Sequence, residues 1–186
     1  MKQAEVRAAY TRFPVVSIGA EYLVMGHLMR RNILTYKAPP NNEGYDLICI
    51  HPDPRRRRPR QIRVQVKSRL ATDHGSGFPV KEKTISAFDF LIVAYMNVGY
   101  FFGRRLRLGC KAGRREPVFY TLPAAFIRRH LDTSSSWEKV NMGGLKVDRY
   151  KNEIGFEQIA VALGIPYPAK AAPSELRTTS LHVKSD

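Results

Sequence analysis

Two segments that alternate apolar and polar residues constrain this chain more than any other feature. They are residues 45–50 (YDLICI) and 62–68 (IRVQVKS), and the connector between them, HPDPRRRRPRQ, contains three prolines. Proline has no amide hydrogen to donate, so the connector cannot continue a sheet ladder. The pattern therefore predicts two strands joined by a long, solvent-exposed hairpin arm over residues 51–61.

Strand geometry sorts the polar residues of these segments. Successive side chains of a strand point to opposite faces, so Arg63, Gln65 and Lys67 share one face of the second segment. In the first segment, Asp46 lies near the start and points away from the face of Leu47. If the two strands pair as neighbours, Asp46 and the Gln65/Lys67 face project toward the same edge of the sheet.

A helix before these strands brings a second carboxylate. Apolar residues at helical spacing predict a helix over SIGAEYLVMGHLMRRN, residues 17–32, with Ser17 as its N-cap. Glu21 borders the apolar face of this helix and can approach Asp46 from it. Two carboxylates and an amide oxygen are ligands that a hard divalent cation such as Mg²⁺ prefers, and Lys67 would supply a positive charge beside them.

The order of these residues resembles the PD-(D/E)XK nuclease superfamily. The matching elements are a glutamate on a first helix, then Gly-Tyr-Asp, then Gln-Val-Lys on the next strand, within roughly residues 15 to 100. The arrangement is similar to the intron-encoded homing endonuclease branch, which also uses glutamine at the place of Gln65. Two departures are Tyr45, where a proline often precedes the aspartate, and Gln65 itself, where the superfamily usually has an acid that binds metal more strongly.

The resemblance implies an α/β fold with a restriction-endonuclease-like core, a mixed β-sheet flanked by helices. It implies hydrolysis of DNA phosphodiester bonds with Mg²⁺ or Mn²⁺, in a homing, restriction-like or repair and recombination role. By the same carry-over, Asp46 and Gln65 are metal ligands, Glu21 is a metal or water contact, and Lys67 is the catalytic lysine.

Each of these residues also has a plainer interpretation. Asp46 closes a turn, Gln65 and Lys67 form the exposed face of a hairpin, and Glu21 is a first-turn glutamate that complements the helix dipole. Two alternative functions follow from that interpretation. One is a catalytically degenerate nuclease fold that only binds DNA, and the other is a basic RNA-binding module.

The charge of the chain favours a polyanionic partner. Lys and Arg number 31 against 16 Asp and Glu, which gives a net charge of +15, and such a balance is typical of proteins that bind nucleic acid. The arm can neutralise several phosphates, although a solvated arm without that role is the alternative. The predicted DNA contacts are Arg55, Arg56, Arg57, Arg58, Arg60, Arg63, Arg69, Arg104 and Arg105.

Length and composition indicate one domain. We expect a single nuclease-like domain over residues 1–167 and a flexible tail over residues 168–186, which are short of large apolar residues. The longest apolar run, residues 88–102, is shorter than a membrane span, and no secretory signal is visible. We therefore expect a cytoplasmic, nucleoid-associated protein with no membrane partner. Cutting both strands of a duplex needs two active sites, so a homodimer or homotetramer is expected.

Several other elements follow from local signals. Residues 71–79 predict a flexible loop, residues 91–96 a buried central strand, and residues 100–103 and 118–122 two further strands. Pro123 is expected to open a short helix. The last helix, EIGFEQIAVAL, is expected to stop at Gly164.

Overall fold

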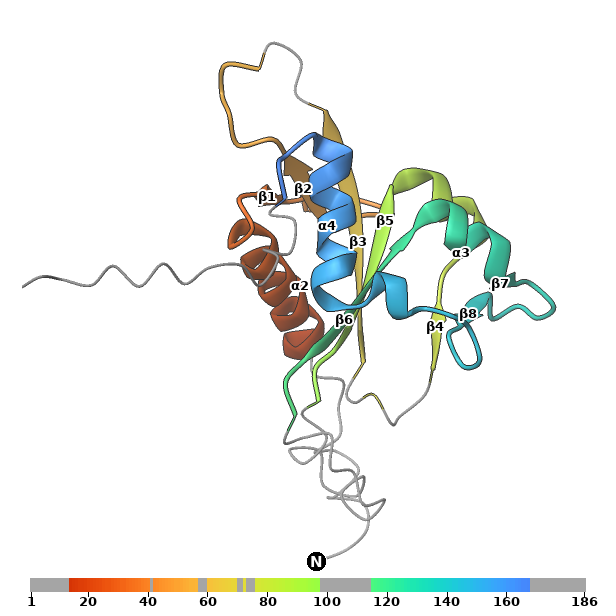
Figure 1. Cartoon of the computed structure of the whole chain (residues 1–186). Helices are drawn as coiled ribbons and strands as arrows, with labels where there is room; N and C mark the ends of the chain where they lie inside the picture. Colours follow the sequence, from red (N-terminus) through yellow and green to blue (C-terminus); the bar gives the residue numbers. More distant parts are fainter. Residues whose placement is uncertain are drawn as a thin grey trace, which may run out of the picture.

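A mixed five-stranded sheet forms the centre of the molecule, in the order β1-β2-β3-β5-β6 (Figure 1). The computed structural model describes residues 14–40, 42–56, 60–69, 72, 76–97 and 115–167. Within them the strands of this sheet are β1 (Leu34–Lys37), β2 (Leu47–Ile50), β3 (Gln61–Arg69), β5 (Phe90–Tyr95) and β6 (Val118–Pro123). The β3–β5 pair is parallel and the other pairs are antiparallel.

Helices and a second, smaller sheet cover the two faces of the central sheet. They are α2 (Pro14–Met29), α3 (Ala124–His130) and α4 (Asn152–Leu163), the 3₁₀ helices η1 (Glu82–Ala87) and η5 (Asp148–Tyr150), and a three-stranded sheet of β4 (Gly77–Pro79), β8 (Lys139–Asn141) and β7 (Leu131–Asp132). This arrangement confirms the expected α/β class, a mixed β-sheet flanked by helices.

The alternation of β3 separates two hydrophobic cores. Val64 and Val66 pack with α2 and α4 on one face of the sheet. On the other face, Leu91 and Val93 of β5 pack with η1, α3 and the small sheet. Gln65 pairs with Leu91 and Lys67 with Val93 in the parallel register, so both polar side chains belong to the η1/α3 face.

Neighbouring strands β2 and β3 form the hairpin that the sequence predicted. They pair antiparallel, with Ile50 opposite Gln61 at the base of the arm. Strand β5 is buried from Leu91 to Tyr95, as expected for a central strand covered on both faces. Because β3 and β5 are parallel, the chain between them must cross over, and β4 and η1 lie on that crossover.

Two helix boundaries agree with the sequence, whereas α2 begins three residues before and ends three residues before the predicted helix over residues 17–32. Helix α3 follows Pro123, and α4 ends at Gly164, whose φ of +69° is the left-handed conformation that favours glycine. Helix α2, however, begins at Pro14 rather than Ser17, since proline suits a first helical turn. Glu21 is therefore in the middle of the helix, and its interpretation as a first-turn dipole partner is wrong.

Four short strands were not predicted from the sequence: β1, β4, β7 and β8. The predicted loop over residues 71–79 contains β4, which pairs with β8 some 60 residues further along the chain. Strand β1 is only four residues long and lies at the sheet edge beside β2. The strand predicted at residues 100–103 and the tail at 168–186 lie outside the described residues.

No helix in the described parts of the chain is both long enough and apolar enough to cross a membrane.

Candidate active site

Strand β3 is longer than its partner β2, and Asp46 lies directly before the first residue of β2. Leu47, the first residue of β2, pairs with Val64. From Gln65 onward, β3 therefore has no β2 residue beside it. The Asp46 N–H donates to the Val64 carbonyl at 2.9 Å, and Asp46 Oδ2 accepts the Val66 N–H at 2.7 Å. The carboxylate therefore takes the place of the next strand carbonyl and is held in a fixed orientation against β3.

The turn before Asp46 restricts the backbone and so helps to hold the Asp46 carboxylate in this orientation. Gly44 has a φ of +99°, and a Cβ there would overlap the Ala87 side chain of η1, so glycine is required for two reasons. Asn42 Nδ2 donates to the Tyr45 carbonyl at 2.8 Å. On the outer side, the Ala38 N–H donates to the Asp46 carbonyl at 2.8 Å. Backbone hydrogen bonds to Ala38, directly after β1, and to Val64 of β3 thus hold the Gly-Tyr-Asp segment from both sides.

Lys67 lies within the electrostatic reach of Asp46. Its side chain is half-buried on the η1/α3 face, and burial lowers the pKa of the Lys67 ammonium. The Asp46 carboxylate opposes that lowering of the pKa, and the Arg69 guanidinium adds to it. A carboxylate and a partly desolvated ammonium are therefore neighbours beside residues 65–69 of β3, the part that β2 does not cover.

Gln65 carries an unusual oxygen. Its Oε1 is buried, and no hydrogen-bond donor reaches it among the residues that the structure describes. Leaving a buried acceptor unpaired costs about 1–3 kcal/mol, so an oxygen in this state is suited to accept a ligand that arrives later.

Glu21 reaches the neighbouring strand rather than the three other residues. Its carboxylate, 17% exposed, forms an ion pair with Lys37 of β1. Lys37 pairs with Leu47, and the next residue, Ala38, bonds to the Asp46 backbone. Glu21 thus lies one strand away from Asp46 on the α2 side of the sheet. No hydrogen bond or ion pair links it to Asp46, Gln65 or Lys67 within the described segments.

The oxygen atoms beside this part of β3 are of the kinds that bind a hard cation. The N–H and C=O of one strand residue point to the same side, so the Val66 carbonyl faces the edge where Asp46 binds. Together with the Asp46 carboxylate and the Gln65 amide oxygen, it makes an all-oxygen set, and Mg²⁺ typically takes one or two carboxylates and keeps several waters. Among the described residues there is no group of three His, Cys, Asp or Glu that could hold a metal ion. Any site here therefore depends on the amide and backbone oxygens.

Sequence reasoning missed one residue that helps to hold β3. Asp89 Oδ2 accepts the Arg63 N–H at 2.7 Å, and the Asp89 N–H donates to the Arg63 carbonyl at 2.9 Å. Asp89 therefore does on the β5 side of β3 what Asp46 does on the β2 side. The available signal was the same in both cases, an aspartate directly before an apolar strand.

The base of the arm is docked on α4. Arg56 Nη1 donates to the Leu163 carbonyl at 3.2 Å, and Arg60 Nη1 donates to the Ala162 carbonyl at 3.2 Å. The last carbonyls of a helix have no partner within it and carry its negative dipole end, which explains why two arginines bind there. These two predicted DNA contacts are therefore engaged within the protein.

The other predicted DNA contacts divide into three groups. Arg55, with a side chain 88% exposed, pairs with Asp53 at 2.9 Å. Arg63 lies 3.5 Å from the Asp89 carboxylate, and Arg69 donates to the Gly77 carbonyl of β4. The remaining four lie outside the described residues: Arg57, Arg58, Arg104 and Arg105.

Comparisons with known proteins give a structural similarity but no match by sequence. No protein-family model matches the sequence, and a search of curated proteins finds no match. Among solved structures, the chain is similar to a bacterial homing endonuclease, I-Ssp6803I, with a TM-score of 0.49 and 14% sequence identity. The similarity covers 82% of this chain and 94% of that one. Similarity at this level establishes neither a family nor an activity for the chain.

Proposed function

We propose that this protein is a DNA endonuclease that hydrolyses phosphodiester bonds with Mg²⁺ or Mn²⁺ at a site built from Asp46, Gln65 and Lys67. One observation supports it most strongly. The Asp46 carboxylate is anchored on the Val66 N–H in the part of β3 that β2 does not cover, beside a half-buried lysine and a buried amide oxygen without a donor. The plainer interpretations of these residues do not account for that combination.

The cation would be held by Asp46, the Gln65 amide oxygen and the Val66 carbonyl. When bound, a divalent ion polarises the scissile phosphate and makes water a better nucleophile. Gln65 contributes an oxygen without a charge, so the site would bind the ion more weakly than one with a second carboxylate in that place.

Lys67 would stabilise the negative charge that builds on the phosphate during attack by water. Fixed charges in a water-poor site act more strongly than in bulk solvent and need no rearrangement as the reaction proceeds. The half-burial of Lys67 and its position beside an anchored carboxylate meet that condition.

Glu21 would join the site only by exchanging its partner. Its carboxylate is now paired with Lys37, one strand from Asp46. A bound cation would compete with Lys37 for that carboxylate, and Glu21 would then contact the metal or a water on it.

DNA is the proposed substrate and partner because of the large net positive charge, +15, and the exposed arginine at the arm. The arginines outside the described residues, Arg57, Arg58, Arg104 and Arg105, belong to the same proposal. The proposed nuclease domain spans residues 1–167 with its arm at 51–61, and a DNA substrate would place the protein in the cytoplasm at the nucleoid.

A second copy of the chain is the proposed partner for cutting both strands, as a homodimer or homotetramer. The outer face of α2 exposes four large apolar side chains at near-helical spacing: Val15 at 69%, Ile18 at 48%, Tyr22 at 53% and Met29 at 48% exposure. Exposed apolar side chains that gather on one helix face are a feature of protein interfaces.

A cleavage assay tests the proposal. Supercoiled plasmid, long linear DNA and branched DNA are incubated with the protein and either Mg²⁺ or EDTA. We expect cleavage with Mg²⁺ and none with EDTA. Asp46→Asn should lower the rate about 100-fold or more, because it removes the charged oxygen that orients the site. Asp132→Asn, the same chemical change at a hairpin turn of the small sheet, should cut like the wild type.

The neutral Gln65 and the engaged Glu21 favour one alternative, a nuclease fold that only binds DNA. In that case the wild type and Asp46→Asn would bind duplex DNA equally, and neither would cut any of the three substrates with Mg²⁺ or Mn²⁺. Preferential binding of RNA over DNA at the same salt concentration would instead support the RNA-binding alternative.

A further inference from the structure

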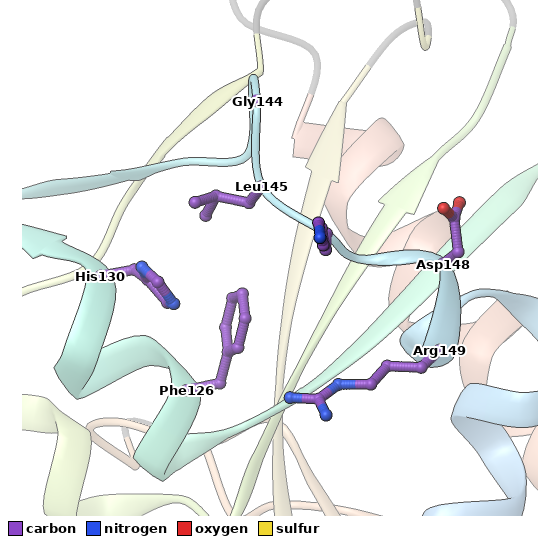
Figure 2. A pocket seen from close by; sticks show the side chains of 7 residues that line it. Phe126, His130, Gly144, Leu145, Asp148 and Arg149 are labelled. Atoms are coloured by element: carbon purple, nitrogen blue, oxygen red, sulfur yellow. The ribbon is translucent and has the colours of Figure 1, made fainter.

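A pocket lies on the face of the sheet that carries Lys67. It has a volume of about 680 Å³ and lies between α3 and the segment 144–149. Figure 2 shows Phe126 and His130 on α3 at one side and Arg149 extending toward Phe126 from η5 at the other. Neither the proposed metal site nor the arm contributes a residue to it.

The apolar part of this pocket is aromatic. Phe126 is half-buried, with its ring centroid 4.5 Å from that of His130 and 5.0 Å from that of Tyr150. Leu145 lines the pocket beside it. The contacts with His130 and Tyr150 fix the Phe126 ring, so the pocket has a rigid wall suited to a planar group.

The rim of the pocket is cationic and unneutralised. Lys146 and Arg149 are both exposed, and neither forms a side-chain hydrogen bond or ion pair within the described part of the chain. Arg149 lies over the Tyr150 ring at 4.8 Å. Asp148 is the single carboxylate among the lining residues, so the two basic side chains leave the rim with a net positive charge.

The segment that carries Arg149 and the strand that carries Lys67 are connected through the central sheet. Lys67 pairs with Val93, Val93 pairs with Tyr120, and Tyr120 bridges to Lys151 directly after η5. Two strand spacings separate Lys67 from Tyr120, a backbone distance of roughly 10 Å.

We propose that this pocket binds one nucleotide unit, with its base against Phe126 and Leu145 and its phosphate at Lys146 and Arg149. Bases stack on aromatic side chains whatever their sequence, and cations at the rim pair with the phosphate. The nucleotide is either free in solution or part of a DNA strand, and both present the same base and phosphate. Binding here needs no metal and no cleavage, so the inference goes beyond the proposed function.

Binding measurements with EDTA present test the pocket apart from catalysis. The ligands are dAMP, a fluorescently labelled five-nucleotide single strand, and a duplex, each titrated into the wild type. The variants are Phe126→Leu, which removes the aromatic face, and Arg149→Gln, which removes one cation. Arg30→Gln makes the same charge change at an exposed residue directly after α2, the helix that packs against the other face of the sheet. Thermal melting checks that every variant is folded.

We expect Phe126→Leu to weaken binding of the single strand about tenfold or more. Arg149→Gln should reduce the slope of log affinity against log salt concentration by about the amount that one phosphate contact contributes. Arg30→Gln should change neither the affinity nor this slope. If dAMP binds and both pocket variants lose it, the nucleotide comes from solution; if only the single strand responds, it belongs to a DNA strand. The proposal is overturned if folded Phe126→Leu and Arg149→Gln bind every ligand as Arg30→Gln does.

Discussion

Lys67→Ala is expected to lower the rate constant for DNA cleavage about 100- to 1,000-fold, the usual effect of removing one group that stabilises transition-state charge. Its affinity for the same duplex should fall little, because at most one phosphate contact is lost. The physical reason is the position of the ammonium, half-buried and beside the anchored Asp46 carboxylate. Single-turnover cleavage with enzyme in excess separates the chemical step from binding.

The matched control is Lys83→Ala, which removes an identical charge from the exposed surface of η1. It should cleave at the wild-type rate. The catalytic role of Lys67 would be ruled out if both variants lost the same activity, or if raising the concentration of Lys67→Ala restored the wild-type rate.

Gly155→Ala is expected to cause a large loss of stability for the addition of one methyl group. Gly155 is buried at the start of α4, where a Cβ would overlap the Tyr150 carbonyl and lie 3.0 Å from Thr121 Oγ1. The carbonyl is backbone and cannot rotate away, so the start of α4 must shift relative to η5. Overpacking of this kind costs about 1–3 kcal/mol, a fall in Tm of about 2–12 °C for a chain of this size.

Gly26→Ala serves as the opposite case in the same assay. Gly26 is exposed on α2, and nothing lies within 4 Å of an added Cβ. Alanine in a helix interior is favoured over glycine by roughly 0.5–1 kcal/mol, so this variant should melt at a higher temperature. Equal melting temperatures for the wild type and Gly155→Ala would show that α4 does not depend on close approach at that point.

The sequence predicted the fold correctly where a local pattern is compatible with a single backbone structure. Alternation in residues 62–68 fixed which side chains of β3 share a face, and the structure has Gln65 and Lys67 together on the η1/α3 face. The prolines of the arm excluded a continuous ladder and led to the β2–β3 hairpin. Gly164 marked the end of α4 through its left-handed backbone. Each of these signals is local, and each was correct.

Pairings between distant segments could not be predicted in the same way. Strand β4 exists because Phe78 pairs with Val140, and nothing near residue 78 indicates that partner. The ion pair of Glu21 with Lys37 depends on the short edge strand β1, which the sequence did not reveal. Arg56 and Arg60 looked free for DNA because the position of the α4 C-terminus beside the arm was unknown.

The proposed nuclease site requires that Asp46, Gln65 and the Val66 carbonyl hold a divalent cation. Titration with Mn²⁺, followed by NMR, tests it without any substrate, because the paramagnetic ion broadens the signals of nearby nuclei. We expect the Val66 amide and the Gln65 side-chain amide to broaden first in the wild type and to keep their signals in Asp46→Asn. The proposal would be contradicted if both signals persisted in the wild type, or if Asp46→Asn showed the same pattern.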